Sequence, residues 1–469
     1  MSAALAPVGA DAPAAVAIVG AGLAGTLTAV HLLRRQPVPL RVLLIERSGR
    51  FGPGIAYGTH DERHLLNVPA ERMSAFEDEP DHFRAWASRR LPALEPGAFL
   101  PRRLYGAYLR ELLEEAEAQA SPGMLERVVG EVVDVRRREK ALELQLADGR
   151  RIACSRCVVA TGSPSGPAPT ELPEDPRVVR DPWATPLGAA PADGSTLLVG
   201  TGLTAVDLVL SHTAAVAGGT APAGPLLALS RRGRLPHAHL PGLRTPAPAP
   251  PLPGGAATLA ELERLLLAHA AQMRGQGYDW RDVVDGLRPV TPALWRLLPI
   301  GERRRFVRER ARGWEVRRHR MAPPVAARLA HLRATRRLRT AAARLLGARA
   351  VRDAVEVDVA AADGGVRTLR CARVVVCTGA CADLTCTPDR LVRALLREGL
   401  ATADSLRLGL RATAGGALVD ARGDADGRLL TLGPLRRGEL WETTAAGEIR
   451  VQAQQLADEL MAAAAPLVC

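Results

Sequence analysis

The sequence predicts an α/β protein with two tandem Rossmann-like dinucleotide-binding domains and a helical insert in the second. Two Gly-rich turns, Gly20–Gly25 (GAGLAG) and Gly200–Ala205 (GTGLTA), each follow a short β-prone run and precede a helical run. The segments that close the two halves also match, because Cys157–Gly162 and Val374–Gly379 are apolar runs that end in Thr-Gly. A chain of 469 residues is long enough for two or three domains.

The first half has every part of a dinucleotide-binding unit. A strand is expected at Val16–Val19, a helix at Thr26–Arg35, and a second strand at Arg41–Ile45 that ends at Glu46. The glycines allow a tight turn, approach of a pyrophosphate and close helix packing, while Glu46 accepts hydrogen bonds from ribose hydroxyls. We expect FAD here, on Gly20, Gly22, Leu23, Ala24, Gly25, Glu46, Arg47, Thr161 and Gly162.

The second half repeats the pattern with one difference. Its second strand, Leu226–Ser230, is followed by Arg231 and Arg232 and by no acid. The guanidinium group of arginine binds a 2′-phosphate through two hydrogen bonds, so this pattern favours NADPH. The alternative is that both are surface arginines in an Arg-rich chain. The residues expected at this site are Gly200, Gly202, Leu203, Thr204, Arg231, Arg232, Thr378 and Gly379.

The domain limits follow from the repeat. We expect an FAD-binding domain at 1–192 and 381–469, and an NADPH-binding domain at 193–380. This is the architecture of a glutathione-reductase-like, two-dinucleotide flavoprotein. The extra length of the second half is a helical insert at about 256–335. Its helices are expected at Leu259–Met273, Trp280–Leu287, Pro292–Leu298 and Glu302–Arg312.

Composition excludes several classes. The net charge of +12, with 61 arginines and one lysine, indicates a solvated surface, a polyanionic partner, or an anionic cofactor and substrate. Only 3% of residues are aromatic, so we expect no nucleic-acid partner.

The uncharged run 12–33 contains the Gly-rich turn, so we expect no membrane span there, and no basic segment precedes it as in a signal peptide. Cys154 and Cys157 lie in a strand-like run, which disfavours a redox role, and the seven cysteines suit a cytoplasmic protein. We expect no metal, because no Cys, His and Asp grouping has zinc spacing.

Motifs along nearly the whole chain give it a family resemblance. The chain resembles bacterial FAD/NAD(P)-binding proteins of the YdhS-like group, distant relatives of flavin-dependent amine N-hydroxylases. A related branch includes nitrosuccinate-forming aspartate N-monooxygenases. Gly447 departs from the pattern, where proline is expected. The motifs are Gly20–Gly25, Gly52–Gly58, Leu65–Ala70, Phe99–Gly106, Asp181–Trp183, Gly200–Asp207, Ser230–Gly233, Leu235–His237, Asp279–Trp280, Arg317–Arg320, Gly433–Leu435, Trp441–Glu442 and Glu448–Arg450.

Further residues are expected around the flavin. The segment Gly52–Gly58 is too glycine-rich for a helix or strand, so it is predicted to cross the flavin as a loop. A final helix from about Ala445 would point its N-terminus at the flavin and stabilise the anionic reduced form. Each of these residues also has a plain structural role as an alternative, such as packing or capping. The set is Tyr57, Asn67, Arg102 (or Arg103), Gly433, Pro434, Thr444 and Ala445.

These features predict an NADPH-dependent flavoprotein monooxygenase. FAD reduced by NADPH would react with O2 to a flavin hydroperoxide that N-hydroxylates a small amine or amino acid. Arg317, Arg318 and Arg320 are candidates to hold a substrate carboxylate. No acid, base or nucleophile is required, so the catalytic residues stay unassigned, as does the oligomeric state. The alternatives are an NADPH-dependent reductase or oxidase without substrate oxygenation, an RNA-directed flavoprotein, and a non-enzymatic redox sensor.

Overall fold

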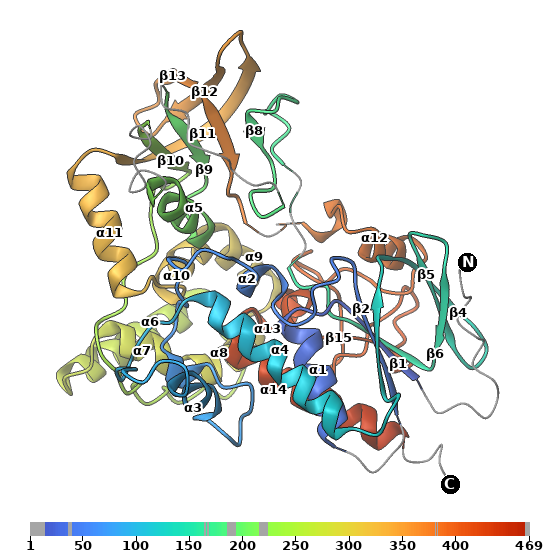
Figure 1. Ribbon diagram of the computed structural model, residues 1–469. Helices are drawn as coiled ribbons and strands as arrows, with labels where there is room; N and C mark the ends of the chain where they lie inside the picture. Colours follow the sequence, from blue (N-terminus) through green and yellow to red (C-terminus); the bar gives the residue numbers. More distant parts are fainter. Residues whose placement is uncertain are drawn as a thin grey trace.

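The chain folds around two parallel sheets, at the lower right and at the top of Figure 1. The computed structural model describes residues 15–35, 40–163, 166, 168–184, 194–214, 224–379, 381 and 383–464. The first sheet has the strand order β15-β7-β1-β2-β3, and all its strands pair in parallel. Its strands are β1 (Ala15–Val19), β2 (Arg41–Glu46), β3 (Leu125–Val129), β7 (Arg156–Val159) and β15 (Leu429–Thr431).

Successive side chains of β1 point to opposite faces of the sheet, and each face packs against a separate hydrophobic core. Val16 and Ile18 pack with α1 (Leu23–Arg34), α4 (Arg102–Gln119) and α14 (Ala446–Ala464). Ala15, Ala17 and Val19 pack on the other side, against an antiparallel three-stranded sheet and α12. The elements on that side are β4 (Val132–Arg137), β5 (Leu142–Leu146), β6 (Arg151–Cys154) and α12 (Arg390–Arg397). Both faces of the parallel sheet are therefore covered, as such sheets require.

The second sheet has the order β13-β12-β11-β10-β9-β14-β8. Its strands from β11 to β8 pair in parallel, while β12 and β13 extend β11 as an antiparallel meander. Helices α5 (Leu203–Ala214) and α11 (Pro323–Ala334) cover one face. The strands are β8 (Val178–Val179), β9 (Thr196–Val199), β10 (Leu226–Ser230), β11 (Leu338–Ala350), β12 (Val355–Ala361), β13 (Val366–Cys371) and β14 (Arg373–Val376).

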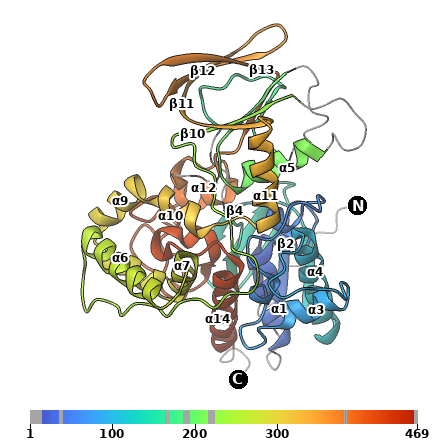
Figure 2. The same ribbon diagram turned by 90° about the vertical axis from the view of Figure 1, so that its left-hand side faces the viewer.

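Between β10 and β11 the chain forms the expected helices, which gather on the left side of Figure 2. Thr258 and Asp279 start two of them with capping boxes, whose side chains bond the first turn reciprocally. The helix expected at Glu302–Arg312 is wrong in one respect, because the backbone bends at Arg310 and divides it in two. The helices are α6 (Leu259–Gly275), α7 (Trp280–Gly286), α8 (Thr291–Leu297), α9 (Ile300–Glu309) and α10 (Ala311–Arg318).

Short elements connect the larger ones, and none of the described helices has the length and apolar character of a membrane span. Trp295 of α8 stacks on Trp441, which fixes the inserted helices against the C-terminal part of the chain. The short elements are α2 (Gly54–Tyr57), η1 (Ala70–Arg72), α3 (His82–Ser88), η2 (Arg288–Val290), η3 (Leu384–Cys386), η4 (Gly433–Arg436) and α13 (Arg437–Leu440).

Candidate functional site

The first glycine of each Gly-rich turn is required by the fold. A Cβ on Gly20, whose φ is +101°, would lie 2.5 Å from the carbonyl oxygen of Ala160. A Cβ on Gly200, whose φ is +131°, would lie 2.2 Å from the carbonyl oxygen of Cys377. Each turn is therefore pressed against the end of the strand that closes its half, and only glycine fits there.

The middle glycine of each turn faces open space instead. The nearest neighbour of a Cβ on Gly22 would be the Cα of Gly54 at 3.5 Å, and a Cβ on Gly202 would meet nothing within 4 Å. The helices α1 and α5 begin directly after these glycines, and the free N–H groups of their first turns favour the binding of phosphate. The hydroxyl oxygen of Thr161 is buried beside the first turn without a hydrogen-bond partner among the described residues. This geometry fits a dinucleotide in both halves.

The residues at the end of the second strand of each half, β2 and β10, make different contacts. Glu46 accepts hydrogen bonds from the backbone N–H of Ala21 at 2.9 Å and from Ser48, so its carboxylate lies at the Gly-rich turn. Arg47 is exposed. In the second half Arg231 is exposed, whereas Arg232 donates to the backbone carbonyl of Glu309 at 3.0 Å. Thr204 is partly exposed at the start of α5, whereas Thr378 and Gly379 are exposed just after β14.

A central cavity of about 180 Å³ lies where α2, α4, α5 and the N-terminus of α14 meet. It brings together six residues expected from the sequence: Tyr57, Asn67, Arg102, Leu203, Thr444 and Ala445. Arg72, Asp207, Arg288, Arg318 and His319 also line it, and only Arg318 among these was a candidate ligand from the sequence.

The expectation of a plain loop at Gly52–Gly58 is wrong. Residues Gly54–Tyr57 form one helical turn, closed by a hydrogen bond from the N–H of Tyr57 to the carbonyl of Pro53. Gly54 has a φ of +54°, and its Cβ would approach the Cα of Gly22 to 2.9 Å. The glycines thus allow the turn to sit directly on the first Gly-rich loop, where Tyr57 lines the cavity and packs edge-on against Tyr105.

Arg102 binds a carboxylate of the other half. Its guanidinium lies 2.5 Å from Asp207 of α5 and 5.7 Å from the ring of Trp183. Burial raises the pKa of Asp207, although Arg102 and His64 act in the opposite direction. His64 is bonded to the carbonyl of Asp207 and to Ser211, so α5 is held to the first half by buried polar contacts.

Two arginines share one glutamate at the start of α14. Arg288 and Arg318 both contact Glu448 at 3.1 Å, and Arg318 also lies 3.3 Å from Glu442. Burial alone would raise the pKa of Glu448, but the two arginines hold it below its ordinary value. Burial and the charge of Arg318 lower the pKa of His319 to about 3, so its ring is neutral at pH 7.

Arg317, Arg318 and Arg320, which were expected to bind a substrate carboxylate, lie in three different environments. Arg318 lines the central cavity, whereas Arg317 lines a different cavity. Arg320 does not line the central cavity, because its side chain is 1% exposed and pairs with Asp285 at 2.6 Å. Arg72 shares Asp285 at 2.9 Å and does face the central cavity.

The last helix begins as expected, one residue later, at Ala446. Thr443 does not cap it: its hydroxyl donates to the carbonyl of Gly433 and accepts from Gln452. Gln452 also accepts from the N–H of Gly433, so Gly433 and Pro434 are fixed beside the helix. The free N–H groups of the first turn are left to face the cavity beside Thr444.

The cysteine pair is unsuited to redox chemistry. Cys154 and Cys157 are buried, and burial raises the pKa of the Cys154 thiol to about 12 and that of Cys157 well above its ordinary value. A thiol in that state forms no thiolate at neutral pH. Among the described residues no group of His, Cys, Asp and Glu is placed to hold a metal ion.

The fold and the open glycines define the class of a dinucleotide-binding flavoprotein, and residues 17–164 match the model of an FAD-NAD(P)-binding family. Cofactors of this class are therefore FAD and NAD(P). A search of curated protein sequences finds no match.

Among solved structures, the fold resembles flavin-dependent hydroxylases over almost its whole length. Ornithine hydroxylase PvdA from Pseudomonas aeruginosa, in its reduced form, is 15% identical with a TM-score of 0.62, covering 96% of this chain and 98% of that chain. Ornithine N-hydroxylase KtzI from Kutzneria sp. 744 is 16% identical with a TM-score of 0.60, covering 96% and 99%. The cadaverine monooxygenase DfoA from Erwinia amylovora is 13% identical with a TM-score of 0.64, covering 96% and 95%. At these identities the likeness concerns the fold.

Proposed function

We propose that the protein is an NADPH-dependent FAD monooxygenase that N-hydroxylates a small amine or amino acid. The observation that carries the proposal is the central cavity, which is lined by α2 and α4 of the first half and by α5 of the second, and which opens on the N-terminus of α14. Its lining includes no Cys or Ser that would act as a nucleophile. The structural likeness to N-hydroxylating monooxygenases supports the same reaction class.

FAD would be held by the first Gly-rich turn, by Glu46 at the ribose and by Thr161, whose buried hydroxyl lacks a partner. When bound, FAD supplies the redox chemistry that links NADPH to O2. The free N–H groups at the start of α14 favour negative charge on the nearby ring. NADPH would lie on the second turn, around Gly202.

The cavity favours a substrate that carries a carboxylate. Arg72, Arg288 and Arg318 line it, each also paired with Asp285 or Glu448, which are not among its lining residues. Asp207, the acid that does line it, is paired with Arg102. Charge-assisted bonds from arginine to carboxylate are the strong kind, so these side chains would fix the acid end of an amino acid. Buried Leu66 and Met73 close another part of the wall and exclude water from the reacting amine. The resemblance to the YdhS-like group and its aspartate-oxidising relatives points to a dicarboxylic amino acid within this class.

The test is substrate-stimulated turnover. The purified flavoprotein is mixed with NADPH and air together with aspartate, glutamate, ornithine or cadaverine, and hydroxylamine products are measured by mass spectrometry. The proposal predicts that one amine both speeds NADPH oxidation and appears as its N-hydroxylated product. The second candidate, a reductase or oxidase, predicts steady NADPH oxidation with peroxide release and no product from any amine. β-Alanine, which lacks one carboxylate of aspartate, is the matched control for acid recognition.

A further inference from the structure

An outer cavity of about 390 Å³ lies beside the central cavity, between α5, α11 and the segment 62–65. Leu65 and Val325 line both cavities, so these two side chains form the partition between them. Val325 is buried, whereas Leu65 is partly exposed. The two spaces therefore share only apolar side chains.

One face of α5 lines both cavities. Leu210 and Thr213 line the outer cavity, and Leu203 and Val206 line the central cavity. These positions are three or four residues apart along the chain, so they lie on one face of the helix. Helix α5 thus forms a wall that runs from one cavity to the other.

Two further segments run the same way. The segment 62–68 lines the outer cavity with its first residues and the central cavity with its last. On α11 the exposed Arg328 lines the outer cavity, whereas Ala322, just before the helix, lines the central cavity. Three parts of the chain thus enclose one path from the surface inward, which is closed by Leu65 and Val325.

Polar contacts hold these walls in place. The hydroxyl of Ser211 on α5 donates to the carboxylate of Asp61 at 2.6 Å, and the ring of His64 lies 2.9 Å from the same hydroxyl oxygen. The backbone N–H of Leu66 donates to the carbonyl of Leu100 at 2.8 Å. The path is therefore preformed, and a rotation of the side chains in the partition is enough to open it.

The chemistry of the path favours a small neutral molecule. The apolar side chains of Leu65, Leu210 and Val325 line its inner part. Two of the three charged side chains at its mouth, Glu62 and Arg63, are paired with neighbouring residues. An amino acid would lose its hydration between the apolar side chains without gaining a hydrogen bond. O2 carries no charge and needs no hydrogen-bond partner, so it passes without that cost.

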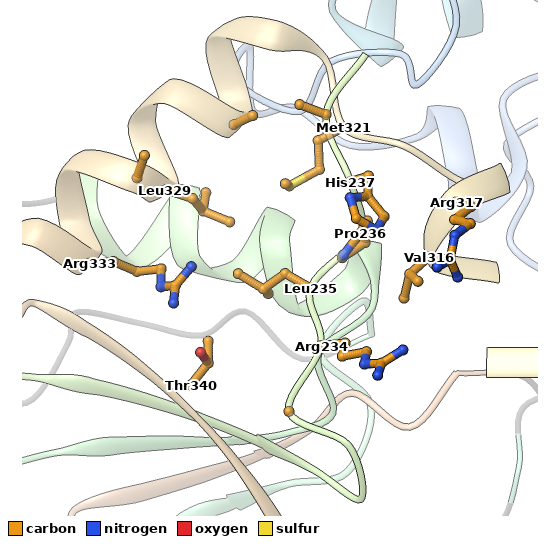
Figure 3. A pocket seen from close by; sticks show the side chains of 14 residues that line it. Arg234, Leu235, Pro236, His237, Val316, Arg317, Met321, Leu329, Arg333 and Thr340 are labelled. Carbon is orange, nitrogen blue, oxygen red and sulfur yellow. The ribbon is translucent and has the colours of Figure 1, made fainter. Parts of the chain in front are cut away.

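A second cavity that adjoins the central cavity has the opposite character (Figure 3). It has a volume of about 630 Å³, lies on another face of α11 and shares only Met321 with the central cavity. Arg234, Arg317 and Arg333 line it, and no carboxylate is among its described lining residues. Such a positively charged space favours anions. The apolar outer cavity is therefore the better route for an uncharged gas.

We propose that the outer cavity is the route by which O2 reaches the central cavity, and that Leu65 and Val325 rotate to let it pass. The inference rests on the proposed function, because O2 is the reactant there. The route admits O2 while polar ligands occupy the rest of the central cavity.

The first test locates an apolar gas and needs no turnover. Xenon enters apolar cavities, so crystals of the FAD-loaded protein are pressurised with xenon and its position is read from anomalous scattering. Xenon is expected in the outer cavity beside Leu65, Leu210 and Val325, and not in the cavity of Figure 3. An outer cavity without xenon would contradict the proposal. This measurement uses the unchanged protein, so it decides the proposal even where a variant fails to fold.

The second test measures how fast O2 reaches the flavin. The FAD-loaded protein is reduced with stoichiometric dithionite and mixed with O2 in a stopped-flow instrument, and the rate constant is taken from flavin absorbance. Leu210→Phe narrows the path and is expected to slow reoxidation about tenfold, which is an added barrier of about 1.4 kcal/mol. Leu210→Ala widens the path and is expected to keep or raise the rate. Leu329→Phe is the matched control, because Leu329 is also a buried helix leucine but lines the cavity of Figure 3.

The outcomes separate the route from the reaction. An unchanged rate in Leu210→Phe, or equal slowing in Leu329→Phe, would overturn the proposal. A raised KM for the amine in Leu210→Phe at an unchanged reoxidation rate would do the same, because the path would then admit the substrate. Slower reoxidation in Leu210→Phe with no hydroxylated product from any amine would support the route and contradict the proposed function. Hydroxylation of an amine at an unchanged reoxidation rate would support the function and contradict the route.

Discussion

The buried ion pair between Arg102 and Asp207 joins the two halves of the protein beside the central cavity. The side chains are 17% and 10% exposed, so each charge depends on the other for compensation. Removal of one partner of a buried pair costs about 3–5 kcal/mol, because the other charge stays buried alone. We therefore expect Arg102→Met and Asp207→Asn each to lower the free energy of unfolding by about that amount.

The pH dependence distinguishes the two variants. In Arg102→Met the carboxyl of Asp207 loses its cation, so burial raises its pKa further above the unfolded value. A group with a raised folded pKa destabilises the protein above that pKa, and the loss is recovered as the pH falls and the carboxyl becomes neutral. Arg102→Met is therefore expected to be less destabilised at pH 5 than at pH 8. Asp207→Asn, which leaves an arginine that stays charged, is expected to show no such recovery.

The assay is urea unfolding followed by circular dichroism and tryptophan fluorescence, analysed where the two probes coincide. The double variant Arg102→Met/Asp207→Asn closes a mutant cycle, and its cost is expected to be smaller than the sum of the single costs by about 2 kcal/mol. Substitution of the exposed pair Arg397 and Glu398 is the control, and it should leave the unfolding midpoint unchanged. Additive single costs, or single costs within the control range, would refute the account of this contact.

Three further predictions test other parts of the molecule. Gly22→Ala should fold with an unchanged melting temperature but lose FAD absorbance, whereas Gly20→Ala should lower the melting temperature, because its Cβ would lie 2.5 Å from a carbonyl oxygen. Burial lowers the pKa of His239 to about 4, so the unfolded chain binds the proton first as the pH falls below about 6.5, and the free energy of unfolding decreases. His239→Gln should therefore make the free energy of unfolding decrease less between about pH 6.5 and pH 4. Iodoacetamide should label the exposed Cys386 and leave Cys154 unmodified in the native protein, as measured by peptide mass spectrometry; equal labelling would contradict the buried strand.

The strands and the two Gly-rich turns were predictable because their signals are local. Val16 and Ile18 alternate with Ala17 and Val19, and this spacing alone assigns them to opposite faces of a strand. The open position at Gly22 follows from the role of a middle glycine in a dinucleotide turn. Such features need only a few neighbouring residues to be recognised.

The charged lining of the central cavity was not predictable in the same way. Arg318 and Glu448 are 130 positions apart, and Arg102 and Asp207 are 105 apart, so no local pattern connects them. Asp207 had a signal, since it lies one helical turn past Leu203 on α5, but sequence alone does not show which face meets the other half. The turn at α2 was missed because helix propensity counts glycine as a breaker, whereas here it permits close contact with Gly22.

The central claim is that oxygen from O2 enters the substrate. The most direct measurement supplies the NADPH-reduced flavoprotein with ¹⁸O₂ and an amino acid from the carboxylate-bearing set, then records the mass of the product. The account predicts an N-hydroxylated product that carries one ¹⁸O atom, with the second oxygen atom released as water. NADPH consumption that yields only labelled peroxide with every amino acid and amine would contradict it and leave an oxidase.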